Sequence, residues 1–246
     1  MKLSVVMPAH NEAGSIADTL RGLHEALASE AIPHELLVVN DNSRDETEAV
    51  LRALGAEIPT LRYVNNAPPN GFGLAVRKGL ESAGGDAVAV VMADGSDTPE
   101  DLVKFYRKME EGYDCVFGSR FLPGGKVVDY PWLKHVLNRI FNFGIRALFG
   151  LRYNDVTNAF KMYRIEVIHG LKPFLSHHFN LTVELPLKAI VRGYSYAVVP
   201  NSWHNRKAGV SKLKIKEMGS RYLFIVMYCF IEKWLCSQDY QKKPAG

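Results

Sequence analysis

The sequence has few cysteines and no long hydrophobic run. Its three cysteines, Cys115, Cys229 and Cys236, form no Cys-x-x-Cys pair or Cys/His cluster, which argues against a zinc ribbon and a disulfide-stapled fold. The longest apolar run, residues 222–231, has ten residues, about half of the roughly 20 that a membrane-spanning helix needs. The apolar start of the chain stops at Pro8, too early for a secretory signal. We therefore expect a protein of the reducing cytoplasm that crosses no membrane unaided.

Several common catalytic and cofactor-binding motifs are also missing. Gly71-Phe72-Gly73 lacks the third glycine of the dinucleotide-binding fingerprint, because Val76 stands in its place. The sequence contains no Walker A motif and no Gly-x-Ser-x-Gly elbow. His177-His178 and His204 have no acidic partner at metal-ligand spacing. These absences argue against a Rossmann dehydrogenase, a P-loop enzyme, an elbow-type serine hydrolase and a zinc enzyme.

The composition is that of a globular protein with a basic end. Hydrophobic residues make up 47% of the chain and charged residues 23%, which argues against disorder. A length of 246 residues suits one large α/β domain or two small ones. The net charge is +4, yet residues 201–246 hold nine Lys and Arg against three acids. Such a tail either binds an anionic partner, such as phosphate, anionic lipid or nucleic acid, or is simply solvated.

Hydrophobic periodicity predicts an α/β fold. Short apolar runs alternate with segments of helical spacing over the first 100 residues, and short apolar strands of this kind are typical of a parallel sheet covered by helices on both faces. The predicted strands are 3–7, 35–39, 61–64, 87–92, 115–117 and 195–199, and the predicted helices are 15–27, 45–54, 73–83, 133–148 and 181–190. We expect a catalytic domain over residues 1–212 and a basic, amphipathic C-terminal segment over residues 213–246.

Polar clusters follow three of the predicted strands, at Pro8–Glu12, Asn40–Asp45 and Asp94–Asp97. Ligands of open α/β sheets bind beyond the carboxyl ends of the strands, so these clusters mark a candidate site. Asp94 and Asp97 follow a fully apolar strand, and two carboxylates there can hold Mg²⁺ or Mn²⁺ against a diphosphate. Alternatively, Asp97 caps the helix that begins near Pro99.

Cationic residues in the second half of the chain form a candidate phosphate-binding group. Arginine binds phosphate oxygens through two parallel hydrogen bonds, and lysine adds a point charge. The group consists of Arg120, Arg206, Lys207 and Lys212, together with the hydroxyl of Ser211. By themselves these residues fit a solvated basic face, but beside a metal site they indicate two phosphates to neutralise.

Eight motifs follow one another between about residue 3 and residue 235: Pro8–Glu12, Asn40–Thr47, Gly71–Ala75, Asp94 with Pro99-Glu100, Gly118–Arg120, Gly124-Gly125, Asp155–Lys161 and Arg206 to Leu213. Their order resembles that of family 2 glycosyltransferases of the GT-A fold, in the branch of dolichol-phosphate mannose synthase.

The resemblance implies an inverting transfer of a sugar from a nucleotide-diphospho-sugar, GDP-mannose or a UDP-hexose, to a polyprenyl or dolichyl phosphate. By this analogy the nucleoside site consists of Pro8, Ala9, Asn11, Glu12 and Asp41. Asp94, with Asp97, would bind Mg²⁺ or Mn²⁺, and Arg120, Arg206, Ser211 and Lys212 would bind the diphosphate and the acceptor phosphate.

Three positions depart from the family pattern. Met92 stands where the family's Asp-x-Asp has its first acid, so Asp97 is expected to substitute as a metal ligand. Asn40-Asp41 replaces a pair of aspartates, which leaves the donor base open. Residues 157–161 read Thr-Asn-Ala-Phe-Lys in place of Thr-Ser-Gly-Phe-Arg, which leaves the sugar open.

The C-terminal segment has the pattern of a helix lying in a membrane surface. Lys212, Lys214, Lys216 and Arg221 come before or at the start of the apolar run and Trp234 lies near its end, a distribution typical of interfacial helices. The predicted helix 133–148 is a second contact of the same kind. The alternative is that both helices pack into the core or into a dimer interface. We expect a peripheral protein on the cytoplasmic face of a membrane, with or without an anchoring partner or a second copy.

Two other functions remain open at this point. The first is transfer to a hydroxyl group of a glycan or small molecule, for which Asp97 would be the leading general base. The second is a non-catalytic nucleotide- and membrane-binding subunit, because Met92 replaces an acid. Nucleic-acid binding is disfavoured because the basic tail contains no recognised reading module.

Overall fold

The computed structural model describes residues 1–205 and 215–242, and it contains a mixed seven-stranded sheet. The strand order is β3-β2-β1-β4-β7-β5-β8, and every neighbouring pair is parallel except those that β7 makes with β4 and β5. The strands are β1 (Leu3–Ala9), β2 (His34–Asn40), β3 (Leu61–Asn65), β4 (Ala87–Val90), β5 (Cys115–Ser119), β7 (Lys161–Arg164) and β8 (Tyr196–Pro200). The predicted mostly parallel sheet is confirmed, and β7 is a strand that the sequence did not reveal.

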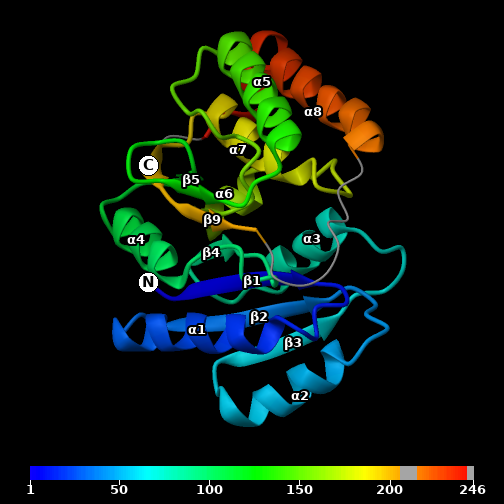
Figure 1. Cartoon of the computed structure of the whole chain (residues 1–246). Helices are drawn as coiled ribbons and strands as arrows, with labels where there is room; N and C mark the ends of the chain where they lie inside the picture. The colour runs from blue at the N-terminus through cyan, green and yellow to red at the C-terminus, as the bar shows by residue number, and fades with distance from the viewer. Residues whose placement is uncertain (206–214, 243–246) are drawn as a thin grey trace.

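Helices cover both faces of the sheet (Figure 1). One face packs against α1 (Ile16–Ser29), α2 (Thr47–Glu57) and α4 (Pro99–Glu110), and the other against α3 (Phe72–Ser82), α6 (Ile165–Gly170) and α7 (Leu181–Val191). Successive side chains of β1 alternate between the two cores, because a strand points neighbouring residues to opposite faces. Val5 and Met7 belong to the first core, and Val6 belongs to the second.

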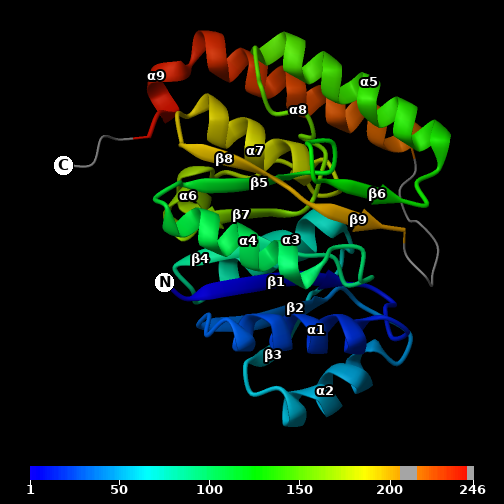
Figure 2. The same cartoon turned by 60° about the vertical axis from the view of Figure 1, so that its left-hand side comes forward.

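Two long helices form an outer layer over α7. α5 (Trp132–Phe149) and α8 (Ile215–Leu235) lie side by side at the top of the molecule, and α9 (Ser237–Tyr240) follows (Figure 2). A buried ion pair joins α7 to α8, with Arg192 Nε 2.6 Å from Glu232 Oε1. Ile225 and Cys229 of α8 are also fully buried. The expected boundary at 212/213 lies outside the described residues, and α8 is packed against the α/β domain.

A two-stranded sheet of β6 (Lys126–Val128) and β9 (Ser202–His204) borders the loop that follows β4. The backbone N–H of His204 donates to the carbonyl of Ser96 at 3.0 Å, and Trp203 forms a bridge with Asp97. The loop that carries Asp94 and Asp97 is therefore held by a strand from more than 100 residues further along the chain.

Within residues 1–205 and 215–242, no helix combines the length and the hydrophobicity that crossing a bilayer requires.

Candidate active site

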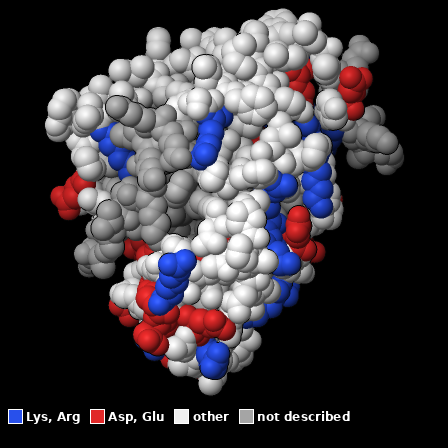
Figure 3. Space-filling view, turned by 90° about the vertical axis from the view of Figure 1, so that its right-hand side faces the viewer, with Lys and Arg blue, Asp and Glu red and all other residues white. Residues whose placement is uncertain are grey.

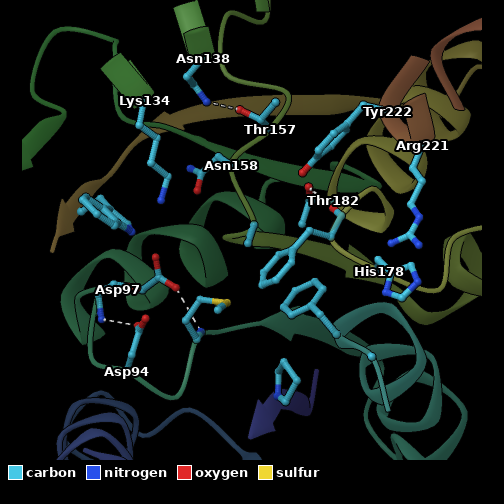
Figure 4. A pocket seen from close by; sticks show the side chains of 18 of the residues that line it. Asp94, Asp97, Lys134, Asn138, Thr157, Asn158, His178, Thr182, Arg221 and Tyr222 are labelled. Carbon is cyan, nitrogen blue, oxygen red and sulfur yellow. Dashed lines mark hydrogen bonds between the residues drawn. The ribbon is translucent and has the colours of Figure 1, made fainter. Parts of the chain in front are cut away.

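A cavity of about 790 Å³ lies at the carboxyl ends of β1, β2 and β4. This is the edge at which the sequence placed the site, since parallel neighbours bring those ends together. The lining includes most of the predicted site residues: Pro8, Ala9, Glu12, Asp41, Asp94, Asp97 and Arg120. One wall continues upward into α5 and α8 (Figure 4).

Asp41 is buried, lines the cavity and organises the approach to α3. Its Oδ1 accepts a hydrogen bond from Asn66 Nδ2 at 2.9 Å, and its Oδ2 accepts one from the Gly71 N–H at 2.9 Å. A carboxylate offers about four acceptor positions, so Asp41 retains capacity for a ligand N–H or O–H. These two hydrogen bonds nevertheless show that Asp41 also has a structural role.

Gly71 and Gly73 must be glycines because the backbone of His177 lies too close to leave room for a Cβ atom at either position. A Cβ on Gly71 would stand 2.6 Å from the carbonyl oxygen of His177, and a Cβ on Gly73 would stand 2.6 Å from the His177 carbonyl carbon. The loop at 177–178 therefore packs directly on the first turn of α3. This explains the Gly-x-Gly spacing without a dinucleotide.

Asn11 does not belong to the lining of the cavity. It has a left-handed φ of 56°, and its Oδ1 accepts a hydrogen bond from the Arg44 N–H at 2.7 Å. Its own N–H donates to Ser43 Oγ at 3.0 Å. Asn11 thus fastens the loop after β1 to the loop after β2, and direct nucleoside binding by Asn11 stays a prediction.

The loop after β4 presents three oxygen-bearing side chains to the cavity, from Asp94, Ser96 and Asp97. Asp97 is buried, and its Oδ2 accepts a hydrogen bond from the Met92 N–H at 3.2 Å. Asp94 Oδ1 accepts one from the Ser96 N–H at 3.1 Å. Burial, with the negative charge of Asp94 adding to it, raises the pKa of Asp97 to about 7.

Ser96 was missed by sequence reasoning. Its hydroxyl is buried, and the described residues offer it no hydrogen-bond partner. A buried unpaired hydroxyl is costly, and this one lies between the two aspartates in sequence. Only its position in the polar cluster could have drawn attention to it.

Arg120 lines the cavity, but its charge is already paired. Its Nε and Nη2 donate to the two carboxylate oxygens of Asp155 at 2.8 and 2.7 Å. Both side chains are buried, and the neighbouring carboxylate raises the pKa of Arg120 against the opposing effect of burial. Binding of a diphosphate by Arg120 stays a prediction, and the structure gives the residue a second role in holding the 154–160 loop.

Lys161, at the position of the family's arginine, is buried and does not line the cavity. Its ammonium group donates to the carbonyls of Val156, Asn158 and Thr182, and burial lowers its pKa to about 7. It fixes the loop whose Thr157 and Asn158 line the cavity.

The cavity contains functional groups from α5 and α8 that sequence reasoning did not assign to the site. Lys134 and Asn138 lie one turn apart on the inner side of α5, and Arg221 and Tyr222 line the opposite wall from α8 (Figure 4). Tyr222 is held by a side-chain hydrogen bond with Thr182. Lys134 and Asn138 are polar residues four positions apart on an amphipathic helix, and this spacing, which places them on one face, was the available signal.

The predicted phosphate-binding residues Arg206, Lys207, Ser211 and Lys212 lie outside the described residues. Their assignment stays a prediction.

Comparison with known proteins adds three observations. Residues 4–171 match the family model described as Glycosyl transferase family 2. The chain is 33% identical to a polyprenol monophosphomannose synthase of Mycolicibacterium smegmatis over 85% of this chain and 80% of that protein. It is 31% identical to a dolichol-phosphate mannosyltransferase of Pyrococcus furiosus over 88% of this chain, and it spans 60% of that longer protein.

Among solved structures, the fold matches glucosyl-3-phosphoglycerate synthase from Mycobacterium tuberculosis in complex with Mn²⁺, UDP and phosphoglyceric acid. The TM-score is 0.70 at 18% identity, with 93% of this chain and 78% of the other covered. At that identity the likeness concerns the fold, which is the GT-A arrangement that the sequence predicted.

Proposed function

The chain belongs to glycosyl transferase family 2, and we propose that it transfers a hexose from a nucleotide-diphospho-sugar to a polyprenyl phosphate. One observation supports the choice of a lipid phosphate as the acceptor. Leu137 and Ile140 of α5 line the cavity and are at the same time 41% and 62% exposed at the molecular surface. The cavity with the two aspartates is thus continuous with an apolar outer face. A lipid phosphate needs such a path, whereas a hydrophilic acceptor does not.

The outer face is almost wholly apolar. The exposed positions of α5, and those of α8 over residues 219–235, include no charged side chain. Apart from Tyr240, every large hydrophobic side chain that the described part of the chain leaves exposed belongs to these helices: Trp132, Leu133, Val136, Leu137, Ile140, Phe143, Leu148, Leu223, Phe224, Met227, Ile231, Trp234 and Leu235. We call this set the α5–α8 face. Figure 3 shows few charged side chains at the top of the molecule and more below.

Exposed apolar patches of this kind mark interaction surfaces. We assign the α5–α8 face to a bilayer because its continuity with the cavity brings a membrane-borne acceptor to the aspartates. Trp132 and Trp234, which are 75% and 64% exposed, are suited to the headgroup region. The protein then lies on the membrane rather than across it.

The residues of the β4 loop fit a divalent cation. Mg²⁺ and Mn²⁺ prefer oxygen ligands and are commonly held by one or two carboxylates together with substrate phosphates. Asp94 and Asp97 supply the carboxylates, and the Ser96 hydroxyl, which has no hydrogen-bond partner among residues 1–205 and 219–236, supplies a further oxygen. A cation bound there would neutralise the charge that develops on the departing diphosphate. Asp97 would then take the place of the missing acid at Met92.

The transfer needs no strong general base. A phosphate monoester is anionic near neutral pH, because its second pKa is about 6. One phosphate oxygen forms a bond to the anomeric carbon while the bond from that carbon to the diphosphate oxygen breaks, which yields the glycosylated lipid phosphate and a nucleoside diphosphate. Attack opposite the leaving group inverts the anomeric configuration. Lys134, which points into the cavity from α5 (Figure 4), contributes positive charge near the reacting phosphates.

The test is transfer by the purified protein in detergent with a polyprenyl phosphate and Mn²⁺. Labelled GDP-mannose and UDP-hexoses are offered separately, and label entering the organic phase is counted. We expect label from one donor and none without the lipid phosphate. Label found only on a water-soluble hydroxyl acceptor would contradict the proposal, and so would binding of metal and donor without transfer to any acceptor.

A further inference from the structure

We propose that Arg221 binds the phosphate group of the acceptor and so positions it for attack. This inference rests on the proposed function and assigns the acceptor phosphate to the α8 side of the cavity. Arg221 lines the cavity from α8 and points toward His178 (Figure 4). Two other cations at or beside the site, Arg120 and Lys161, are held by protein partners.

The guanidinium of Arg221 has no hydrogen bond or ion pair with residues 1–205 or with the side chains of α8 over residues 219–235. By contrast, Arg120 is bound by Asp155, and Lys161 donates to three carbonyls. Arg192 is likewise bound by Glu232. The guanidinium of Arg221 lines the cavity and can bind an anion there. Its planar fork matches two phosphate oxygens.

The position of Arg221 on α8 places it where the cavity meets the α5–α8 face. Tyr222 also lines the cavity, and its hydrogen bond with Thr182 fixes this turn of α8. The next two residues, Leu223 and Phe224, are each 60% exposed on the apolar face. One turn of helix therefore presents a cation to the cavity and two large apolar side chains to the surface. A lipid phosphate has this same division between a charged end and an apolar chain.

The donor diphosphate belongs to the opposite wall. Asp94 and Asp97 come from the loop after β4, and in Figure 4 they lie across the cavity from Arg221. When the hydrocarbon chain of a lipid phosphate stays on the α5–α8 face, its phosphate group enters the cavity from the side of α8 and contacts Arg221 first. Arginine suits this boundary because its aliphatic stem can lie along apolar surface while its charged end remains with the ligand.

The test compares Arg221→Ala, Arg221→Lys and the control Arg152→Ala. Arg152 is exposed, lies just after α5 and does not line the cavity. We expect Arg221→Ala to raise the KM for the lipid phosphate roughly 10- to 100-fold, the range for losing hydrogen bonds to a charged group. The KM for the sugar donor should stay unchanged, Arg221→Lys should recover part of the loss, and Arg152→Ala should match the wild type.

Two further measurements separate acceptor binding from other roles. The same rise in KM should appear with a short, water-soluble prenyl phosphate, and binding of Arg221→Ala to anionic vesicles should equal that of the wild type. A change in the donor KM alone, or an unchanged acceptor KM, would overturn the inference. Loss of vesicle binding that accounts for the whole effect would also overturn it.

The inference can fail separately from the proposed function. Calorimetric titration of the short prenyl phosphate into the wild type and into Arg221→Ala measures the contact without catalysis. Binding that is lost in the variant supports the assignment even where no sugar donor is turned over. Equal binding to both proteins contradicts it even where the wild type transfers sugar.

Discussion

Asp155 holds the guanidinium of Arg120 with both carboxylate oxygens, at 2.7 and 2.8 Å, and its Oδ2 also accepts the Arg120 backbone N–H at 3.0 Å. Both side chains are buried next to the cavity. Arg120, which the sequence assigned to phosphate binding, is therefore also part of the framework that shapes the site. This relationship leads to a first prediction about stability.

Removing the carboxylate of Asp155 should destabilise the fold. Asp155→Ala leaves a buried guanidinium without its counter-charge, and breaking a buried pair in this way costs about 3–5 kcal/mol. The free energy of unfolding, measured with urea, should fall by that amount. Glu57→Ala breaks the exposed pair with Arg21 and should lower the free energy of unfolding far less, because solvent screens the two charges. An equal loss of unfolding free energy in the two variants would show that the buried Arg120–Asp155 pair contributes no more to stability than an exposed pair.

The sheet and the first half of the site could be predicted because they depend on local patterns. The apolar runs at 3–7 and 35–39 form β1 and β2, which pair in parallel. Parallel pairing then brings Pro8 and Asp41 to one edge, where both line the cavity. Strand periodicity and strand-end polarity were sufficient for this part.

The other half of the site depends on contacts between distant segments. β7 begins with Lys161, and a charged residue at this position does not indicate a buried strand. The segment joins the sheet because β4 and β5 on either side form backbone hydrogen bonds with it. The placement of β9 against Ser96 and Asp97 links residues more than 100 positions apart. Neither relation has a periodicity that sequence reasoning can detect.

Asp97 should make the metal-free protein less stable as the pH rises. Its folded pKa is about 7, against 3.8 for the unfolded group, so between these values the folded state holds a proton that the unfolded state has lost. The contribution is therefore fully present below about pH 4 and is lost as the pH rises through 7. Asp97→Asn removes the titration and keeps an acceptor for the Met92 N–H.

With EDTA present, Asp97→Asn should therefore be more stable than the wild type at pH 8, by up to about 4 kcal/mol for three pKa units. Near pH 4, where this loss has barely begun, the two proteins should be close. Denaturation curves at both pH values measure the difference. A variant that is less stable than the wild type at pH 8 would contradict the assignment of a destabilising buried charge.

Metal-dependent turnover should distinguish the ligands of the β4 loop. Asp94→Asn removes a charged oxygen ligand and should lower kcat/KM at least about 100-fold, in the range that loss of electrostatic stabilisation causes. Ser96→Ala removes a neutral oxygen and should mainly raise the Mn²⁺ concentration needed for half-maximal rate. Asp18→Asn, on an exposed aspartate of α1, is the control. Wild-type turnover of Asp94→Asn would remove this loop from the metal site.

The α5–α8 face should bind membranes through its apolar side chains. A charge at Ile140 or Phe224, which are 62% and 60% exposed, would have to enter the bilayer interface, whereas the folded protein in water tolerates it. Ile140→Asp and Phe224→Asp should reduce cosedimentation with anionic vesicles at unchanged melting temperature. Ala53→Asp, on the exposed side of α2, should bind vesicles like the wild type. If the two variants instead convert a dimer to a monomer, the face is an interface between copies.

A histidine cluster far from the cavity should make stability fall in mild acid. His34 Nε2 lies 3.1 Å from His24 Nδ1 and 3.2 Å from Thr60 Oγ1, and its Nδ1 is hydrogen-bonded to the carbonyl of Ile32 at 2.8 Å. Burial chiefly, together with His24, lowers the pKa of His34. The unfolded ring, with a pKa of about 6.5, therefore binds a proton at a higher pH than the folded ring. The contribution to stability is present above about pH 6.5 and is lost as the pH falls below it.

His34→Gln should therefore flatten the pH dependence of unfolding. The free energy of unfolding of the wild type should drop between pH 7.5 and pH 5.5 by more than that of the variant, whatever the two values are at pH 7.5. His169→Gln, at an exposed position on α6, should keep the wild-type slope. The slope, rather than the absolute stability, is the informative quantity, because loss of the hydrogen bonds of His34 changes stability at every pH. Parallel slopes for the wild type and His34→Gln would mean that the His24–His34 contact does not favour the neutral ring.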